Sequence, residues 1–223
     1  MPFPRDNNNL HRVKIAAFFA LTSLGFVRCE EYDTNDSDHY DNESEIVSKV
    51  ELMFLPENGG PPVLASFSDP DGDGGMSGTA EEIVLVQNQR YTLNIRVLNE
   101  LAHPPVDISE ELRHEAEEHL FFIFGEGVQG PASFSPTALL VHDYADRESD
   151  YVVNTVGEDL PVGLVHTITA NQTGTSQLRL MLKHLPELNG TPQKQAGLPQ
   201  QLADGLPLPG EVDIDISFVL RVL

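Results

Sequence analysis

Hydrophobic and polar residues alternate along the chain from about residue 46 to its last residue. VSKVELMFLP at 47–56 alternates and stops at a proline, and EVDIDISFVLRVL at 211–223 alternates along most of its length. A period of two is typical of strands, whose successive side chains point to opposite faces. Comparable short runs, separated by turn residues, occur at 62–75, 81–100, 119–127, 137–144 and 163–185.

These runs predict the fold class. Roughly seven to nine short strands with frequent turn signals are typical of an antiparallel sandwich. We therefore predict one mostly β, immunoglobulin-like β-sandwich domain over 46–223. Within 81–100, two alternating stretches flank Gln87–Arg90 and predict a hairpin or one bent strand. The Pro/Gln/Gly-rich stretch 186–210 is expected to be a long loop before the last strand.

One stretch departs from the strand pattern and predicts a short helix at about 107–119. Asp107 or Ser109 can cap its N-terminus, and the pair Pro104–Pro105 precedes it, as expected just outside a helix. At about 100° per residue, one helical face is apolar. That face consists of Ile108, Leu112, Ala116 and Leu120.

The same stretch, RHEAEEHL, is rich in possible metal ligands. The HExxH zinc motif needs histidines four residues apart, but His114 and His119 are five apart and about 140° apart around a helix. Glu115 and His119 are four apart and can share an ion. One carboxylate and one imidazole make half a site, which a histidine from a strand must complete. The candidates are His142, His166 and His184.

This metal hypothesis has a simpler alternative. His119 falls within the apolar face of the helix and Glu115 at its edge, so His119 can pack against the sheet and hydrogen-bond locally. His114, Glu117 and Glu118 lie on the opposite face, where charged side chains are solvated. If a metal binds, zinc suits a mixed imidazole and carboxylate set, and copper is the other candidate.

A second candidate metal site is the segment SDPDGDGG at 68–75. Asp69, Asp71 and Asp73 have the spacing of a calcium-binding loop. The twelfth position of an EF-hand loop is a bidentate glutamate, but here it is Ala80, and strands rather than helices are predicted on both sides. The segment is therefore no EF-hand. A calcium-binding sandwich loop and a simple Asp/Gly turn remain the two interpretations.

No motif predicts catalysis. Gly125–Gly130 matches G-x-G-x-x-G after a predicted strand, but Pro131 and Pro136 prevent the helix that a dinucleotide site requires. No nucleophile elbow, Walker A motif or Cys–His arrangement occurs in the sequence. We expect a protein that is not an enzyme.

Charge narrows the choice of partners. The chain has 35 acidic and 13 basic side chains and a formal net charge of −22. Nucleic-acid binding depends on Lys and Arg that displace counterions, and anionic lipid headgroups also attract basic segments. We therefore expect neither nucleic acid nor a headgroup as a partner.

The N-terminal region predicts export. Residues 1–28 have the features of a signal peptide, because a basic start is followed by the apolar stretch Ile15–Val27. Cys29, the only cysteine, stands where a bacterial lipoprotein is acylated, although Arg28 fits the usual motif poorly. Residues 29–45 are strongly acidic and predict a disordered tether. We expect an outer-membrane lipoprotein, with plain secretion as the alternative.

Several of these segments together resemble a known group. SDPDGDGG, VLNE followed by DISEELRHEAEEHLFFIF, LRLMLKH and EVDIDISFVL occur in an order similar to that of uncharacterised bacterial envelope lipoproteins best represented in Bacteroidota. Some of these are labelled type 1 periplasmic binding fold superfamily proteins, although this chain is too short and too β-rich for that two-lobed fold. The likeness covers about residues 46–223. Its recurrent positions correspond here to Glu115, Glu118, His119, His184, Asp69, Asp71 and Asp73.

The resemblance implies a function. Members of the group often occur beside TonB-dependent outer-membrane receptors, which implies an envelope protein that handles a nutrient. We therefore expect a lipid-anchored binding protein that captures zinc or copper for such a receptor. Glu115, His119 and His184 would bind the metal, with His142 or Glu118 completing the site. The alternative is a non-catalytic structural or protein-interaction sandwich with a calcium-stabilised loop.

Overall fold

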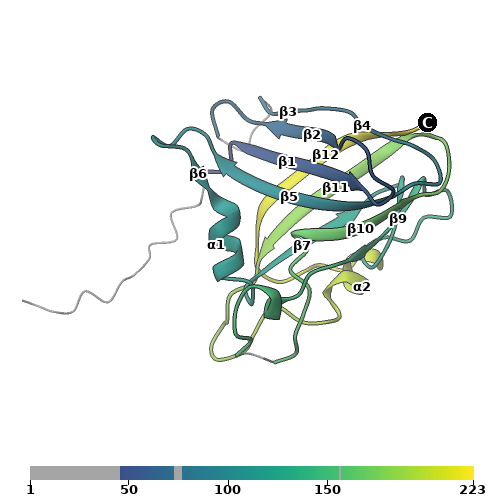
Figure 1. Cartoon of the computed structure of the whole chain (residues 1–223). Coiled ribbons are helices and arrows are strands. Elements are labelled where there is room, and N and C mark those ends of the chain that lie inside the picture. Colours follow the sequence, from purple (N-terminus) through teal and green to yellow (C-terminus); the bar gives the residue numbers. More distant parts are fainter. Residues whose placement is uncertain (1–45, 73–76, 156) are drawn as a thin grey trace, which may run out of the picture. The chain divides into compact units, whose positions relative to one another are not determined.

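The computed structural model describes residues 46–72, 77–155 and 157–223 (Figure 1). The predicted signal peptide (1–28), Cys29, the acidic segment up to residue 45 and Asp73 lie outside the described residues. The elements are β1 (Lys49–Pro56), β2 (Val63–Ser68), β3 (Thr79–Ala80), β4 (Ile83–Leu85), β5 (Arg90–Asn99), β6 (Val106–Asp107), α1 (Ile108–His114), β7 (His119–Phe124), β8 (Val128–Gln129), β9 (Leu140–Tyr144), the 3-10 turn η1 (Glu148–Asp150), β10 (Val165–Ala170), β11 (Gly174–His184), α2 (Leu198–Ala203) and β12 (Glu211–Val222).

The strands form two sheets, so the prediction of a mostly β fold is confirmed. One sheet has the order β3-β2-β1-β5-β10-β9-β8, with β6 paired to β5, and the other has the order β4-β12-β11-β7. Most pairs are antiparallel. However, β4 pairs with β12 and β8 pairs with β9 in parallel. Both sheets are therefore mixed, and the prediction of a purely antiparallel architecture is not confirmed.

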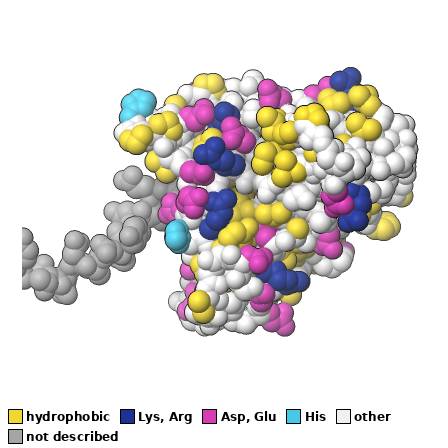
Figure 2. All heavy atoms as spheres, viewed as in Figure 1, with side chains coloured by type: hydrophobic (Ala, Val, Ile, Leu, Met, Phe, Trp, Pro, Cys, Tyr) yellow, Lys and Arg dark blue, Asp and Glu magenta, His cyan; other side chains and the backbone are white. Residues whose placement is uncertain are grey.

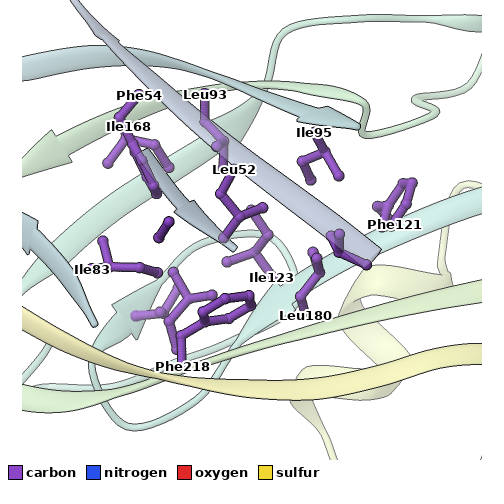
Figure 3. Packing of buried hydrophobic residues seen from close by; sticks show 14 of the residues in the cluster. Leu52, Phe54, Ile83, Leu93, Ile95, Phe121, Ile123, Ile168, Leu180 and Phe218 are labelled. Carbon is purple, nitrogen blue, oxygen red and sulfur yellow. The ribbon is translucent and has the colours of Figure 1, made fainter. Parts of the chain in front are cut away.

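The core lies between the two sheets. Alternate residues of each strand point inward, as the period of two in the sequence requires. Figure 3 shows Leu52 and Leu93 from the larger sheet directed toward Ile123, Leu180 and Phe218 from the smaller one. These five side chains are at most 1 % exposed. Removal of their apolar surface from water is the main force that holds the sheets together.

The alternating stretch 81–100 forms neither a hairpin nor one bent strand. It contains two strands, as the pattern indicates, but β4 belongs to the smaller sheet and β5 to the larger one. Asn88 has a φ of 61° in the turn between them, a conformation that asparagine tolerates better than most residues. β4 pairs with the end of β12, a contact between segments far apart in the sequence.

Helix α1 is shorter than predicted. Asp107 is its N-cap, and its side chain accepts a hydrogen bond from the Ser109 backbone N–H at 3.1 Å. The predicted apolar face is buried, with Leu112 and Ala116 at most 1 % exposed. The helix ends at His114, and 115–118 form turns that lead into β7. His119 is therefore the first residue of a strand and not part of the helix.

The stretch 186–210, expected to be a loop, contains the second helix, α2. Its Leu198 joins a second apolar cluster with Leu120, Phe122 and Met181. These three residues lie on the outer side of β7 and β11, so the stretch covers that side of the smaller sheet. β7 is consequently buried on both faces. None of the helices in the described part of the chain has the length and apolar character needed to cross a membrane.

Candidate metal centre

Two histidines meet at one end of the core. His119 begins β7 and His184 ends β11, and the two are direct cross-strand partners. His119 continues the inward row of Phe121 and Ile123, and His184 continues that of Leu180. Their rings stack with centroids 4.6 Å apart and an interplanar angle of 6°. The pair therefore forms the last layer of the core, where the space between the sheets ends.

Two glutamates of the preceding turn stand over this pair. Oε2 of Glu115 is 3.7 Å from Nδ1 of His119, and Oε2 of Glu118 is 3.6 Å from Nε2 of His184. One ligand atom each of Glu115, His119 and His184 lies within 4.8 Å of the others. His119 is nearly buried, whereas the side chains of both glutamates are 44 % exposed. The two imidazoles therefore form the inner side of the group, and the carboxylates of Glu115 and Glu118 form its solvent-exposed rim.

Burial sets the protonation of these groups. Desolvation, and next the charge of His184, lower the pKa of His119 to about 4. Desolvation, followed by the charges of Glu111 and Glu118, raises the pKa of Glu115 above its usual value. His119 is therefore neutral at pH 7 and has one nitrogen with a lone pair. Its Nδ1 also lies 3.2 Å from the backbone oxygen of Glu115, a contact that orients the ring.

The turn that carries the glutamates is held from several sides. Nζ of Lys194 donates to the Ala116 backbone oxygen at 2.6 Å and forms an ion pair with Glu148 at 2.8 Å. Both side chains of that pair are at most 2 % exposed. The Leu185 N–H donates to the backbone oxygen of Glu118 at 2.6 Å. These contacts fix the 115–118 turn relative to β11 and the 186–210 stretch.

Glu117 has a different role from its neighbours. It was expected on a solvated face, but its carboxylate accepts hydrogen bonds from the backbone N–H and the hydroxyl of Thr155. It therefore ties the turn to the segment that follows η1. The sequence did not point to Glu117, Lys194 or Glu148 as functional, because a single lysine in a Pro/Gln-rich stretch has no pattern that names its partner.

His142 and His166 lie elsewhere. They are neighbours on β9 and β10, with ring centroids 5.3 Å apart. Nε2 of His142 donates to the Ile123 backbone oxygen at 2.9 Å. Ile123 lies four residues after His119 in β7. That separation is about 13 Å along a strand. The structure thus brings His184 to Glu115 and His119, with Glu118 beside them, and leaves His142 and His166 apart from the group.

The acidic turn has an internal contact. Oγ of Ser77 is 3.0 Å from Oδ1 of Asp69 and 2.6 Å from Oδ1 of Asp71. Asp69 is 1 % exposed. The third predicted calcium ligand, Asp73, lies outside the described residues.

The geometry around the histidines is close to what a transition metal requires. Two nitrogens bound to one tetrahedral zinc ion at about 2.0–2.1 Å lie about 3.3 Å apart. The ligand atoms here lie within 4.8 Å of one another. Metal binding would therefore require side-chain rotations that bring these atoms closer, and the carboxylates of Glu115 and Glu118, 44 % exposed, have room to rotate. A fourth ligand can be Glu118 or water.

Comparison with known proteins adds no assignment, since no family model, curated protein or solved structure matches this chain.

Proposed function

We propose that the protein binds a transition metal ion, zinc or copper, through Glu115, His119 and His184. The proposal rests on one observation: residues from the α1–β7 turn and from the far end of β11 place three ligand atoms within 4.8 Å of one another. Here each ring has its own glutamate within 4 Å.

The donor set selects the metal. Imidazole suits zinc and copper, and carboxylate suits zinc and harder cations, while thiolate or thioether ligands would favour copper(I). The group contains two imidazoles and one carboxylate, which favours zinc and copper(II). Metal ligands must be deprotonated, and the neutral His119 meets that requirement at pH 7. The exposed rim leaves a path by which an ion can enter and leave.

The proposed biological role is capture of this ion in the cell envelope. It is supported by the export signal expected in 1–28, by the position of Cys29 as an acylation site, and by the resemblance to envelope lipoproteins. In this role an immunoglobulin-like β-sandwich, anchored by lipid and held off the membrane by its acidic tether, delivers zinc or copper to a TonB-dependent outer-membrane receptor. Release to a receptor requires an exchangeable ion, for which a rim of exposed carboxylates is suited.

The test is direct titration of the purified chain with zinc and with copper(II), together with the metal content after purification. His119→Ala and His184→Ala are expected to abolish binding. His114→Ala is the matched control, because this exposed histidine lies five residues from His119 but outside the group. Stoichiometric binding that survives in both His119→Ala and His184→Ala, or no binding in the wild type, would rule out this site.

The alternative is a structural or protein-interaction domain with a calcium-stabilised turn at 68–75. The contacts of Ser77 with Asp69 and Asp71 support an ordered turn there. In that case calcium raises the melting temperature, Asp71→Ala removes the increase, and zinc has no effect. Melting curves with each cation separate the two functions.

A further inference from the structure

The turn that carries the two glutamates is bound by a buried lysine from a distant part of the chain. Lys194 lies in the 186–210 stretch, and its ammonium donates to the Ala116 backbone oxygen at 2.6 Å. Ala116 directly follows Glu115 in the sequence and is 0 % exposed. The contact therefore fixes the backbone immediately beside a proposed metal ligand.

The backbone of the turn passes this constraint on to the histidines. The Glu118 N–H donates to the Glu115 backbone oxygen at 2.9 Å, and that oxygen also lies 3.2 Å from Nδ1 of His119. The Leu185 N–H donates to the Glu118 backbone oxygen at 2.6 Å, and Leu185 directly follows His184. A displaced turn would therefore carry the Glu115 carboxylate away from both imidazoles.

The lysine is itself held in a defined position. Glu148 forms an ion pair with the Lys194 ammonium at 2.8 Å, and both side chains are at most 2 % exposed. The second carboxylate oxygen of Glu148 accepts from the Leu160 N–H at 3.1 Å and from the side-chain amide of Asn154. Lys194 therefore connects the η1 region to the turn through contacts that are buried.

A cation beside a metal site needs a counter-charge. Lys194 lies close enough to His119 that its charge, after desolvation and the charge of His184, contributes to the lowered pKa of that imidazole. On its own, the same charge would repel a metal ion bound to His119. Glu148 offsets this repulsion, because the ion pair has no net charge. The lysine can therefore act through its hydrogen bond without opposing the ion.

We propose that Lys194 is a positioning residue of the metal site, an inference that rests on the function proposed above. Its hydrogen bond to Ala116 holds Glu115 where it can share an ion with His119 and His184. Replacement of residues that orient metal ligands typically lowers metal affinity about 10–100-fold. Such coupling is reciprocal, so a bound ion also stabilises the contact of Lys194 with the turn.

The test is titration of the full chain with zinc, using a variant that conserves charge. Lys194→Met/Glu148→Gln removes the hydrogen bond to Ala116 and replaces an ion pair without net charge by two neutral side chains. A change in zinc affinity is then not caused by a change in the net charge near the site. We expect the zinc Kd of this double variant to rise about tenfold.

The control is a variant that weakens the fold without touching the turn. Ile83 is 0 % exposed and pairs with Leu220 near one end of β12, whereas His184 pairs with Glu211 at the other end. Ile83→Val leaves a small cavity in the core and lowers stability. Because this change is far from the ligands, its zinc Kd should stay within about twofold of the wild-type value. Urea unfolding shows that each variant is folded.

Hydrogen exchange supplies a readout that a purely structural role would not move. The amides of Leu198 and Gln201 are hydrogen-bonded within the stretch that carries Lys194. In the wild type, zinc should slow their exchange more than that of the Ala170 amide in the larger sheet, which reports general stabilisation by a ligand. In the double variant this difference should disappear. Equal slowing at all three amides of the wild type would overturn the proposal, even if the double variant did not fold.

The titrations separate the positioning role from the metal site itself. Zinc binding by the wild type, together with an unchanged Kd in the double variant, would overturn the positioning role and leave the metal site in place. A Kd that rises equally in Ile83→Val would also overturn it, because affinity would then follow stability. A wild type that binds no zinc contradicts the proposed function on which the role of Lys194 rests.

Discussion

At the scale of single residues, the position of His119 depends on the strand and not on the helix. The sequence pairs it with Glu115 by helical spacing, but the structure reaches the same pairing through a turn, because α1 ends at His114. Its partner His184 shares the inward parity of Leu178, which the alternation in LRLMLKH already indicates. Strand register is set by contacts distant in sequence. The sequence alone therefore could not choose between His184 and the two other candidate histidines.

Glu115 and Glu117 are expected to differ sharply although they are two residues apart. Glu115→Ala removes a carboxylate from the ligand group and should lower zinc affinity more than about tenfold, with little effect on stability. Glu117→Ala removes the hydrogen bonds to Thr155 and should cost about 1 kcal/mol of unfolding free energy, with zinc affinity unchanged. Titration calorimetry and urea unfolding of both variants measure the two effects. The reverse pattern would show that Glu117, not Glu115, supplies the carboxylate.

At the scale of elements, the strands themselves were predictable and their partners were not. Hydrophobic alternation located β1, β5, β9, β11 and β12 within a few residues. It could not show that β4 and β5, which are consecutive in the sequence, belong to different sheets, or that β4 pairs with β12 in parallel. That pairing depends on the packing of both sheets. Hydrophobic periodicity also does not identify the side chains that hydrogen-bond to the outer edge of β7, the last strand of the smaller sheet. Tyr144 and His142 donate to the backbone oxygens of Phe121 and Ile123.

This edge closure predicts the effect of a small change in β9. The hydroxyl of Tyr144 donates to the Phe121 backbone oxygen at 2.9 Å. Tyr144→Phe keeps the ring but leaves a buried oxygen without this donor, at a cost of about 1–3 kcal/mol. Urea unfolding measures the loss, and hydrogen exchange should show weaker protection of β7 amides. An unchanged stability would mean that another donor, such as water, replaces the hydroxyl.

The buried Lys194–Glu148 pair joins three elements and predicts a larger effect. Lys194→Met keeps most of the side-chain volume but leaves the Glu148 carboxylate buried without its cation. Removal of one partner of a buried pair costs about 3–5 kcal/mol. The double variant Lys194→Met/Glu148→Gln leaves no uncompensated charge and should recover part of this loss. If both proteins unfold at the same urea concentration, the charge of Glu148 is not the cause.

At the scale of the whole molecule, ionisable side chains at the surface and in the core contribute differently to stability. On the face that Figure 2 shows, acidic and basic side chains lie beside one another. Arg96 forms ion pairs of this exposed kind with Glu51 and Asp107. Such exposed pairs contribute little to stability. The buried ionisable groups matter more. The sequence names His142 and His166 as candidate ligands but does not show that they are buried, because burial of a histidine in a strand depends on which face meets the core. His142 and His166 are at most 3 % exposed.

These two histidines link the stability of the fold to pH. Desolvation lowers the pKa of His142 to about 4, and desolvation and then the charge of His142 lower that of His166 to about 3. In the unfolded chain both pKa values are about 6.5. Below that pH the unfolded state binds protons that the folded state does not, so the stabilising contribution is present above pH 6.5 and is lost as the pH falls toward 4. Asp146 opposes this trend, since burial raises the pKa of its carboxyl.

The variant His142→Gln separates the contribution of His142 to this pH dependence from that of the other buried groups. Between pH 7.5 and pH 5, His142 alone should account for a loss of about 2 kcal/mol of unfolding free energy. His142→Gln does not titrate, and its amide can still donate to the Ile123 oxygen. Its unfolding free energy, measured in urea at both pH values, should therefore fall by about 2 kcal/mol less than that of the wild type, whereas the exposed His114→Ala should follow the wild type. Equal losses in His142→Gln and the wild type would mean that the acid sensitivity of the fold originates in other groups. Removal of a buried histidine that stays neutral to about pH 4 must change the slope of the unfolding free energy against pH.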